Sequence, residues 1–123
     1  MAADASIENG EEVFKKCRAC HQIGENAKNG VGPAQNGVIG RTAGTVEGYN
    51  YSPLNKAAGA AGLVWTEENV FNYLADPNAF LKQFLTEKGK ADQATGATKM
   101  VFKLPDETER RNVIAYLKSF PGK

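Results

Sequence analysis

Hydrophobic residues recur at helical spacing in several short segments, and the first of these lies near the N-terminus. We predict a helix over Ile7–Cys17, because Ser6 is a suitable N-cap and early glutamates favour the positive end of a helix dipole. Gly10 and Phe14 lie four residues apart in this segment, so they share one helical face.

Further helical segments follow in the middle of the chain. A turn and a short helix are predicted over Tyr49–Asn55, with Pro53 in the first helical turn. A clearer helix begins at Thr66 and ends at Asp76-Pro77, and the spacing of phenylalanine and leucine predicts another over Ala79–Lys88.

The strongest helical pattern is Asp106–Phe120, which has an acidic start and a Pro-Gly stop. By contrast, Gly24–Gly48 is too rich in glycine for regular helix, and Lys90–Lys99 is a polar loop. No segment shows the period-two alternation of a strand. We therefore predict an all-α fold of four or five short helices and long loops. A chain with this much irregular backbone often wraps a bound group.

Composition narrows the class of protein. Lysine plus arginine is 15 and aspartate plus glutamate is 14, a net charge of +1 that argues against nucleic-acid binding. The chain has 41% hydrophobic and 24% charged residues, which is typical of a globular protein. No apolar run approaches the roughly 20 residues that span a bilayer, so we expect no membrane insertion. The length predicts one domain over residues 6–120, with a flexible N-terminus (1–5) and a C-terminal tail (121–123).

The first residues lack the cationic start and apolar stretch of a signal peptide. Ala2-Ala3-Asp4 resembles the start of a chain after signal cleavage, with Met1 added for expression, but a native cytoplasmic start fits equally well.

Cys17, Cys20 and His21 form the motif C-x-x-C-H, which is the attachment signature of c-type haem. Two residues between the thiols allow one helical turn to present both sulfurs to one porphyrin edge, and the adjacent imidazole then reaches the iron. Three alternatives remain. They are a thioredoxin-like redox pair, half of a zinc site and a chance match. The chain shows no βαβ pattern for the first and too few Cys and His residues for the second.

A second ligand to such an iron cannot be histidine, because His21 is the only one in the chain. Apart from Met1, the only methionine is Met100, and its thioether is a soft ligand that favours ferrous iron. A lone methionine usually fills a core. Met100 instead follows a polar stretch, and this favours the ligand interpretation.

These residues resemble class I c-type cytochromes, in particular the bacterial cytochrome c2 type, over Gly10–Leu117. The resemblance implies the cytochrome c fold around one covalent haem c, with Gly10 and Phe14 packed across Tyr116 of the C-terminal helix. It implies that Pro33 accepts a hydrogen bond from His21. It also implies a haem pocket that includes Arg41, Tyr49, Tyr51, Asn55, Trp65, Tyr73, Thr98 and Phe102.

Two features depart from the family pattern. Gln35 stands where the family has a leucine that packs on the haem, so either this amide turns outward or the pocket is wetter there. The stretch between Pro77 and Met100 is also longer than in mitochondrial-type members, as in long bacterial c2 proteins.

Ligation by His21 and Met100 leaves no open iron position, which predicts outer-sphere electron transfer rather than an enzyme. We expect a monomeric carrier in the periplasm, with a bc1-type donor and an oxidase, photosynthetic reaction centre or dehydrogenase system as partner. Two alternatives stay open. One is a sensor or peroxidase-like enzyme with a labile Met100, and the other is a haem-free thiol protein.

Lysines near the motif and ligand segments predict a basic rim that docks on acidic redox partners. A scatter of solvated lysines is the simpler interpretation of the same residues. The predicted docking set is Lys15, Lys16, Lys28, Lys88, Lys90, Lys99 and Lys103.

Overall fold

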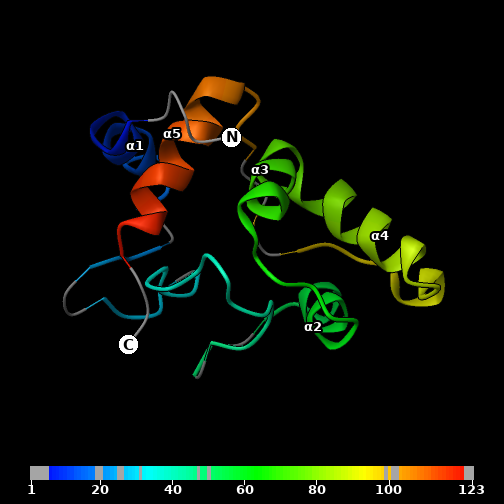
Figure 1. Cartoon of the computed structure of the whole chain (residues 1–123). Coiled ribbons are helices and arrows are strands. Elements are labelled where there is room, and N and C mark those ends of the chain that lie inside the picture. The colour runs from blue at the N-terminus through cyan, green and yellow to red at the C-terminus, as the bar shows by residue number, and fades with distance from the viewer. Residues whose placement is uncertain are drawn as a thin grey trace.

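Two helices from opposite ends of the chain cross at one side of the molecule. In this structure, a computed structural model, α1 spans Ile7–Phe14 and α5 spans Glu107–Lys118, and the two lie side by side (Figure 1). The structure describes residues 6–18, 21–24, 27–30, 32–46, 48–49, 51–98, 100 and 103–120.

The crossing is close because α1 has a glycine at the contact. A Cβ at Gly10 would overlap the carbonyl oxygen of Asn112 and lie 2.7 Å from Tyr116 Cβ, both in α5. One turn further on, the rings of Phe14 and Tyr116 are buried with their centroids 5.4 Å apart. The predicted pairing of Gly10 and Phe14 with the C-terminal helix is therefore present.

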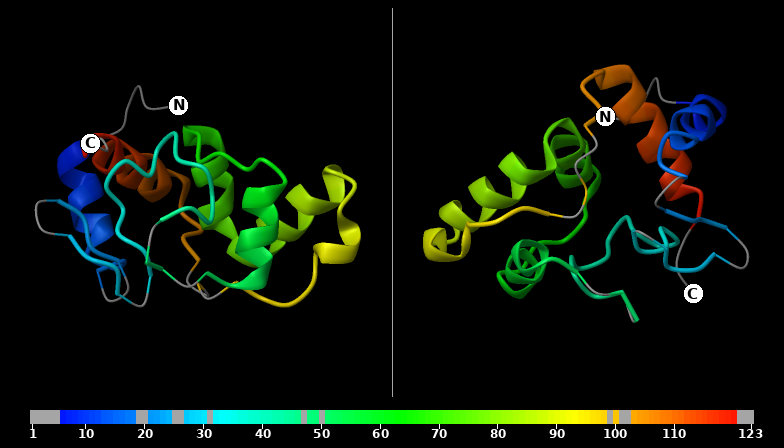
Figure 2. Two further views of the ribbon diagram at one scale, coloured as in Figure 1. Left: turned by 90° about the horizontal axis from the view of Figure 1, so that it is seen from below. Right: turned by 180° about the vertical axis from the view of Figure 1, so that it is seen from behind.

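The remaining helices form the other side of the molecule. They are α2 (Pro53–Ala60), α3 (Glu67–Ala75) and α4 (Pro77–Glu87), followed by the short 3₁₀ helix η1 (Ala91–Gln93). The chain after η1 returns along α4 towards α3 before α5 begins (Figure 2). The described residues on either side of Met100 are bonded to these helices, Thr98 to Asn78 of α4 and Leu104 to Leu74 of α3.

Each α-helix begins at a polar side chain that accepts a hydrogen bond from the backbone amide three residues later, at 2.9–3.2 Å. Such caps satisfy amides that the first helical turn leaves without a partner. The capping residues are Ser6, Ser52, Thr66, Asp76 and Asp106.

Several predicted bounds were wrong. The first helix ends at Phe14 rather than Cys17, because tight bonds such as Cys17 N to Phe14 O (2.7 Å) replace the helical pattern. The fourth begins at Pro77, since proline is compatible with a first helical turn and Asp76 caps it.

Two more bounds differ. The last helix ends at Lys118 rather than Phe120, and the polar loop Lys90–Lys99 contains η1. The second helix was expected within Tyr49–Asn55 but runs on to Ala60.

The all-α prediction is confirmed. The described residues form five α-helices and one 3₁₀ helix, and their only strand-like pairing is an isolated bridge between Thr42 and Val64. Described residues within Gly24–Gly48 contain no helix. Among the described residues, no helix is both long and apolar enough to span a bilayer.

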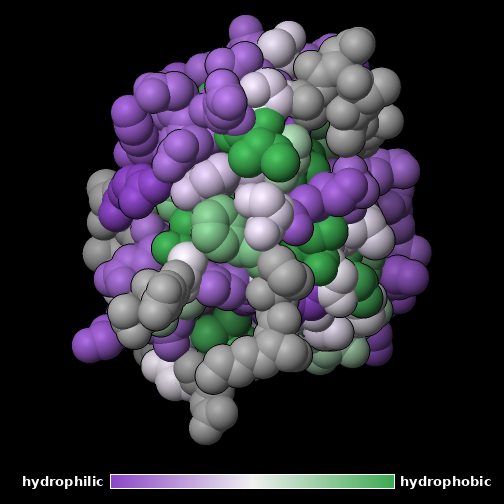
Figure 3. Space-filling view, turned by 60° about the vertical axis from the view of Figure 1, so that its left-hand side comes forward, coloured by the Kyte–Doolittle hydropathy of each residue, from purple (hydrophilic) through white to green (hydrophobic). Residues whose placement is uncertain are grey.

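One hydrophobic cluster joins the two sides of the molecule. Leu54 of α2, Leu81 and Leu85 of α4, and Ile114 of α5 all belong to this cluster and are at most 1% exposed. On the face shown in Figure 3, hydrophobic residues gather towards the middle and hydrophilic residues towards the edge. The cluster also contacts Cys17 and Met100, both partly buried, so the core continues to the motif and to the ligand segment.

Candidate functional site

A cavity of about 200 Å³ lies between the loop 32–46, α2, α3 and the Met100 segment. It is larger than the roughly 150 Å³ engineered cavity that holds benzene. Side chains such as Val38, Val70 and Leu74 form an apolar wall, whereas polar groups concentrate near α2. The cavity therefore suits a large apolar group with a polar end.

His21 lies at one side of this cavity against a glycine. A Cβ at Gly32 would lie 2.6 Å from His21 Nδ1, so a larger residue there would displace the imidazole. His21 Nδ1 is 2.9 Å from the carbonyl oxygen of Pro33, which is the contact that the family resemblance implies. This contact orients the ring and leaves Nε2 available for a metal.

The surroundings of His21 favour its neutral form. Burial is the largest effect and lowers the pKa of His21; the Pro33 carbonyl raises it, and the charge of Arg41 lowers it. A neutral imidazole is the form that ligates metals.

Gln35 does not turn outward, so of the two expected arrangements the structure has the one with a polar amide at the pocket. Its amide lies at the cavity wall, with Nε2 2.8 Å from His21 Nδ1 and 3.1 Å from the Pro33 oxygen. The Gln35 amide thus contacts the His21 imidazole at Nδ1, on the side away from Nε2.

The polar end of the cavity is formed by Arg41, Tyr49, Tyr51, Ser52 and Asn55. Arg41 donates to the Ala34 carbonyl at 3.0 Å. Burial is the largest effect on two of these groups. Burial lowers the pKa of Arg41, and the charge of Tyr51 raises it in part. Burial raises the pKa of Tyr51, whereas the hydrogen bond from the Val46 amide and the charge of Arg41 lower it.

Asn55 carries an orphaned buried atom. Its Oδ1 has no hydrogen-bond partner among the described residues. Rotating the amide by 180° exchanges its oxygen and nitrogen, so Asn55 can present a donor to an anionic group. An unpartnered buried polar atom is costly, which indicates that a polar ligand group satisfies it.

Aromatic rings close the cavity on the α3 side. The rings of Trp65 and Tyr73 meet edge to face at 4.7 Å, and Phe80 stands 6.0 Å from Tyr73. Burial raises the pKa of Tyr73 to about 12, although a hydrogen bond with Thr98 opposes this shift. Tyr73 is therefore a neutral hydroxyl beside the Met100 segment.

The Met100 segment is anchored to two helices on either side of its methionine. Thr98 N donates to Asn78 Oδ1 of α4 at 2.7 Å, and Leu104 N donates to the Leu74 carbonyl of α3 at 2.7 Å. These bonds hold Met100 at the cavity wall.

A buried arginine adds a third anchor. Arg110 of α5 donates to the carbonyls of Leu104 (2.7 Å) and Pro105 (2.8 Å), and its guanidinium lies 4.3 Å from the ring centre of Phe71. Arg110 was not predicted, because an arginine among acidic residues of a helix usually reaches solvent.

Cys17 lies three residues beyond the end of α1 and is partly buried, and its carbonyl accepts from His21 N at 2.9 Å. This hydrogen bond connects the first cysteine with the histidine. Three residues of the predicted site, Cys20, Lys99 and Phe102, lie outside the described residues.

The structure brings together most of the other predicted pocket residues. The cavity is lined by His21, Pro33, Arg41, Tyr49, Tyr51, Asn55, Trp65, Tyr73, Thr98 and Met100. Ser52 was not predicted, although a serine before Pro53 is a signal for a helix cap. The apolar wall was not predicted either, because its residues carry no pattern distinct from ordinary core.

The described lysines of the predicted docking set differ in their ion-pair partners. Three of them pair with carboxylates at 2.8–3.4 Å: Lys15 with Glu12, Lys16 with Glu109, and Lys103 with Asp76. Lys28, Lys88 and Lys90 are exposed, and none of them forms an ion pair within the described residues.

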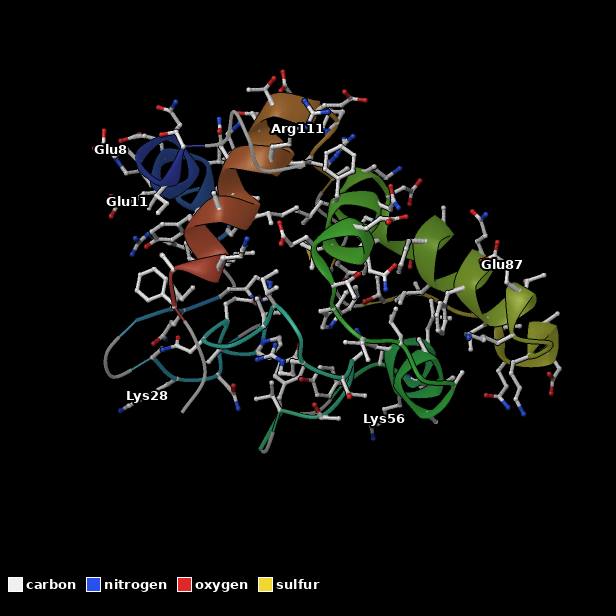
Figure 4. The ribbon with its side chains drawn as sticks, in the orientation of Figure 1. Glu8, Glu11, Lys28, Lys56, Glu87 and Arg111 are labelled. Atoms are coloured by element: carbon white, nitrogen blue, oxygen red, sulfur yellow. The ribbon has the colours of Figure 1, made fainter. Side chains whose placement is uncertain are left out.

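Some of the labelled charged residues lie on opposite sides of the molecule. Lys28 in the loop and Lys56 on α2 lie on one side of the molecule, whereas Glu8 and Glu11 of α1 lie at the opposite end (Figure 4). Lys56, next to the cavity residue Asn55, is a basic residue that the predicted docking set did not include.

The residues present fit a haem group. The cavity offers an imidazole and a thioether for iron, an apolar wall for the porphyrin, and Arg41 and Asn55 for carboxylates. A zinc site finds no support in the described part of the chain, where no three His, Cys, Asp or Glu residues are close enough to share a metal.

The chain is similar in sequence to known proteins. The family model described as Cytochrome c matches residues 7–121. The chain is 63% identical over 117 residues to "Cytochrome c2 iso-2" of Rhodospirillum centenum, covering 95% of this chain and 97% of that protein. It is 64% identical over 108 residues to "Cytochrome c2" of Rhodopseudomonas palustris, covering 88% and 92%.

Solved structures show the same relation. A cytochrome c2 structure from Rhodospirillum centenum matches with a TM-score of 0.94 at 62% identity, over 96% of this chain and 100% of that one. A cytochrome c2 from Rhodobacter sphaeroides matches with a TM-score of 0.82 at 35% identity, over 97% and 98%.

Proposed function

The chain belongs to the cytochrome c family, and we propose that Cys17 and Cys20 bind its one covalent haem c while His21 and Met100 ligate the haem iron. The protein is an electron carrier, not an enzyme. The observation that carries the proposal is the convergence of His21 and Met100 on one cavity. The bound haem supplies an iron that alternates between ferrous and ferric states.

His21 is oriented for this role by its neighbours. Gly32 leaves room for the ring, and the Pro33 carbonyl is placed to accept from Nδ1, so Nε2 is the nitrogen that binds iron. Burial keeps the imidazole neutral. The chain thereby fixes both the tautomer and the direction of the ligand.

Met100 is oriented by its anchors. Because hydrogen bonds hold Thr98 to α4 and Leu104 to α3, the thioether stays near the cavity without rearrangement of the helices. A neutral sulfur ligand and the apolar wall both favour ferrous iron, and they exclude water from the site.

The polar end of the cavity binds the propionates. Arg41 supplies a cation, and Tyr49, Tyr51, Asn55 and Trp65 supply donors, which together offset the cost of burying carboxylates. We assign Pro33, Tyr73, Thr98 and Phe102 to the surroundings of the two iron ligands.

The ligand assignment is tested by spectra of the oxidised and dithionite-reduced protein. Wild type should give sharp low-spin c-type bands and the weak long-wavelength sulfur–iron band of the ferric form. Met100→Ala should abolish that band and lower the midpoint potential.

Leu74→Ala is the matched control, because it removes a buried apolar side chain from the same cavity and keeps the thioether. A sulfur–iron band that survives in Met100→Ala would refute the assignment. Carbon monoxide binding to the ferrous wild type at neutral pH would instead indicate a labile Met100 and a sensor or peroxidase-like role.

We assign the protein to the periplasm as a monomer whose domain spans residues 6–120. It exchanges electrons with a bc1-type donor and with an oxidase, photosynthetic reaction centre or dehydrogenase system. Small, transient interfaces are typical of such redox encounters.

Docking on acidic partners uses exposed lysines, of which Lys28 has the clearest position on the loop side (Figure 4). Bimolecular electron transfer should slow as ionic strength rises, and Lys28→Gln should weaken this dependence. Arg111→Gln, on the opposite side, is the control. A rate that is indifferent to salt contradicts electrostatic docking.

A further inference from the structure

Three polar atoms meet behind His21, on the side away from a metal at Nε2. They are His21 Nδ1, the Pro33 carbonyl oxygen and the Gln35 amide, with pairwise distances of 2.9, 3.1 and 2.8 Å. A leucine at this position would leave the Pro33 carbonyl as the acceptor. Gln35 therefore adds a polar contact at the atom that controls the basicity of the ligand.

The tautomer of His21 decides how the Gln35 amide must lie. When Nε2 binds iron, the proton of the neutral imidazole is on Nδ1, which then donates. An amide N–H cannot face another N–H at 2.8 Å as its hydrogen-bond partner. Rotating the amide by 180° places Oε1 near Nδ1, and Oε1 and the Pro33 oxygen, 3.1 Å apart, then share the single Nδ1–H as donor.

We propose that Gln35 is a positioning residue that gives the Nδ1–H of His21 a second acceptor, beside Pro33, and thereby lowers the reduction potential of this protein. The inference rests on the proposed ligation of iron by His21. Two acceptors make the imidazole a stronger electron donor, and a more basic ligand stabilises ferric over ferrous iron.

The opposite orientation of the Gln35 amide would have the opposite effect on the reduction potential. If Gln35 keeps its N–H towards Pro33, it competes with His21 for one carbonyl and weakens the His21–Pro33 bond. Removing the amide would then strengthen that bond. The direction in which the Nδ1–H responds to substitution therefore separates the two arrangements.

The test uses the haem-loaded protein and two variants. Gln35→Leu removes the acceptor with little change in size, and Gln35→Glu keeps the length while offering only acceptors when ionised. Gln83→Leu makes the first change at an exposed position of α4. The measurements are the midpoint potential and the NMR shift of the His21 Nδ1–H in the diamagnetic reduced protein.

We expect Gln35→Leu to move the Nδ1–H signal upfield and to raise the ferrous-to-ferric ratio at fixed ambient potential by threefold to tenfold. For a one-electron couple this is a rise of ~28 to ~59 mV. Gln35→Glu should move both measurements the other way, and Gln83→Leu should move neither.

Two results overturn the inference while leaving the proposed function intact. A changed potential with an unmoved Nδ1–H signal means that Gln35 acts only through pocket polarity. A downfield signal in Gln35→Leu means that the amide donates to Pro33. If wild type lacks the low-spin His/Met spectrum, the proposed function fails and the inference fails with it.

Discussion

The crossing of α1 and α5 depends on the missing side chain of Gly10, and Gly10→Ala measures how much. In an exposed helix this change adds about 1 kcal/mol of stability, because alanine is the better helix former. Here the new Cβ would overlap the carbonyl oxygen of Asn112 and approach Tyr116 Cβ to 2.7 Å.

The backbone carbonyl cannot rotate away, so the helices must separate. Overpacking of this kind costs about 1–3 kcal/mol, and a backbone obstacle places Gly10→Ala near the upper figure. Subtracting the gain in helix propensity leaves a net loss of about 2 kcal/mol. Separation would also disturb the nearby contact between the Phe14 and Tyr116 rings.

The assay is denaturant unfolding of the haem-loaded protein, followed by far-UV circular dichroism. Asn9→Ala is the control, since it lies on the exposed face of the same helix and should change stability by no more than about 0.7 kcal/mol. If Gly10→Ala is as stable as wild type, the close crossing described for these helices does not limit stability.

Two further positions test buried polar groups. Arg110→Leu leaves the Leu104 and Pro105 carbonyls without their donor and should cost about 3 kcal/mol of unfolding free energy. Arg110→Lys keeps a charge and should cost less. Equal stability of wild type and both variants would contradict the role of Arg110 as an anchor. Tyr73 has a raised pKa of about 12 against an ordinary 10, so its contribution is complete below pH 10 and is lost as pH rises through 12. Relative to Tyr73→Phe, wild type should lose about 3 kcal/mol over that range in denaturant titrations at stepped pH, and a flat difference would refute the burial argument.

Local signals accounted for most of the helices. Asp106 and Thr66 are capping residues whose effect is confined to one helical turn, so they can be recognised in the sequence. Helix ends were harder to place. At Phe14 the chain leaves the helix through tight turns that bring Cys17 and His21 into position, and no residue between them is a helix breaker.

The site was only partly predictable for a similar reason. Cys17, Cys20, His21 and Met100 were singled out because their chemistry is unusual for their context. The distances around these residues could not be predicted, because the contact between Gln35 and His21 depends on how the loop 32–46 folds back on the motif.

Arg110 illustrates the same limit at longer range. The carbonyls that Arg110 contacts belong to Pro105 and Leu104, five and six residues earlier in the chain. Helical periodicity does not indicate these contacts, because they depend on how the Met100 segment packs against α5. A charged residue in an acidic helix gives no sign that it will be 7% exposed.

The anchoring of the Met100 segment also bears on the order of assembly. A chain delivered N-terminus first presents the cysteines and His21 early, while the third anchor of the methionine segment, Arg110, belongs to the last helix. The residues proposed to attach the haem therefore precede all of these anchors, and the anchoring of Met100 is complete only when Arg110 reaches the carbonyls of Leu104 and Pro105. Along the chain, the proposed attachment of the haem is thus separate from the contacts that close the site around it.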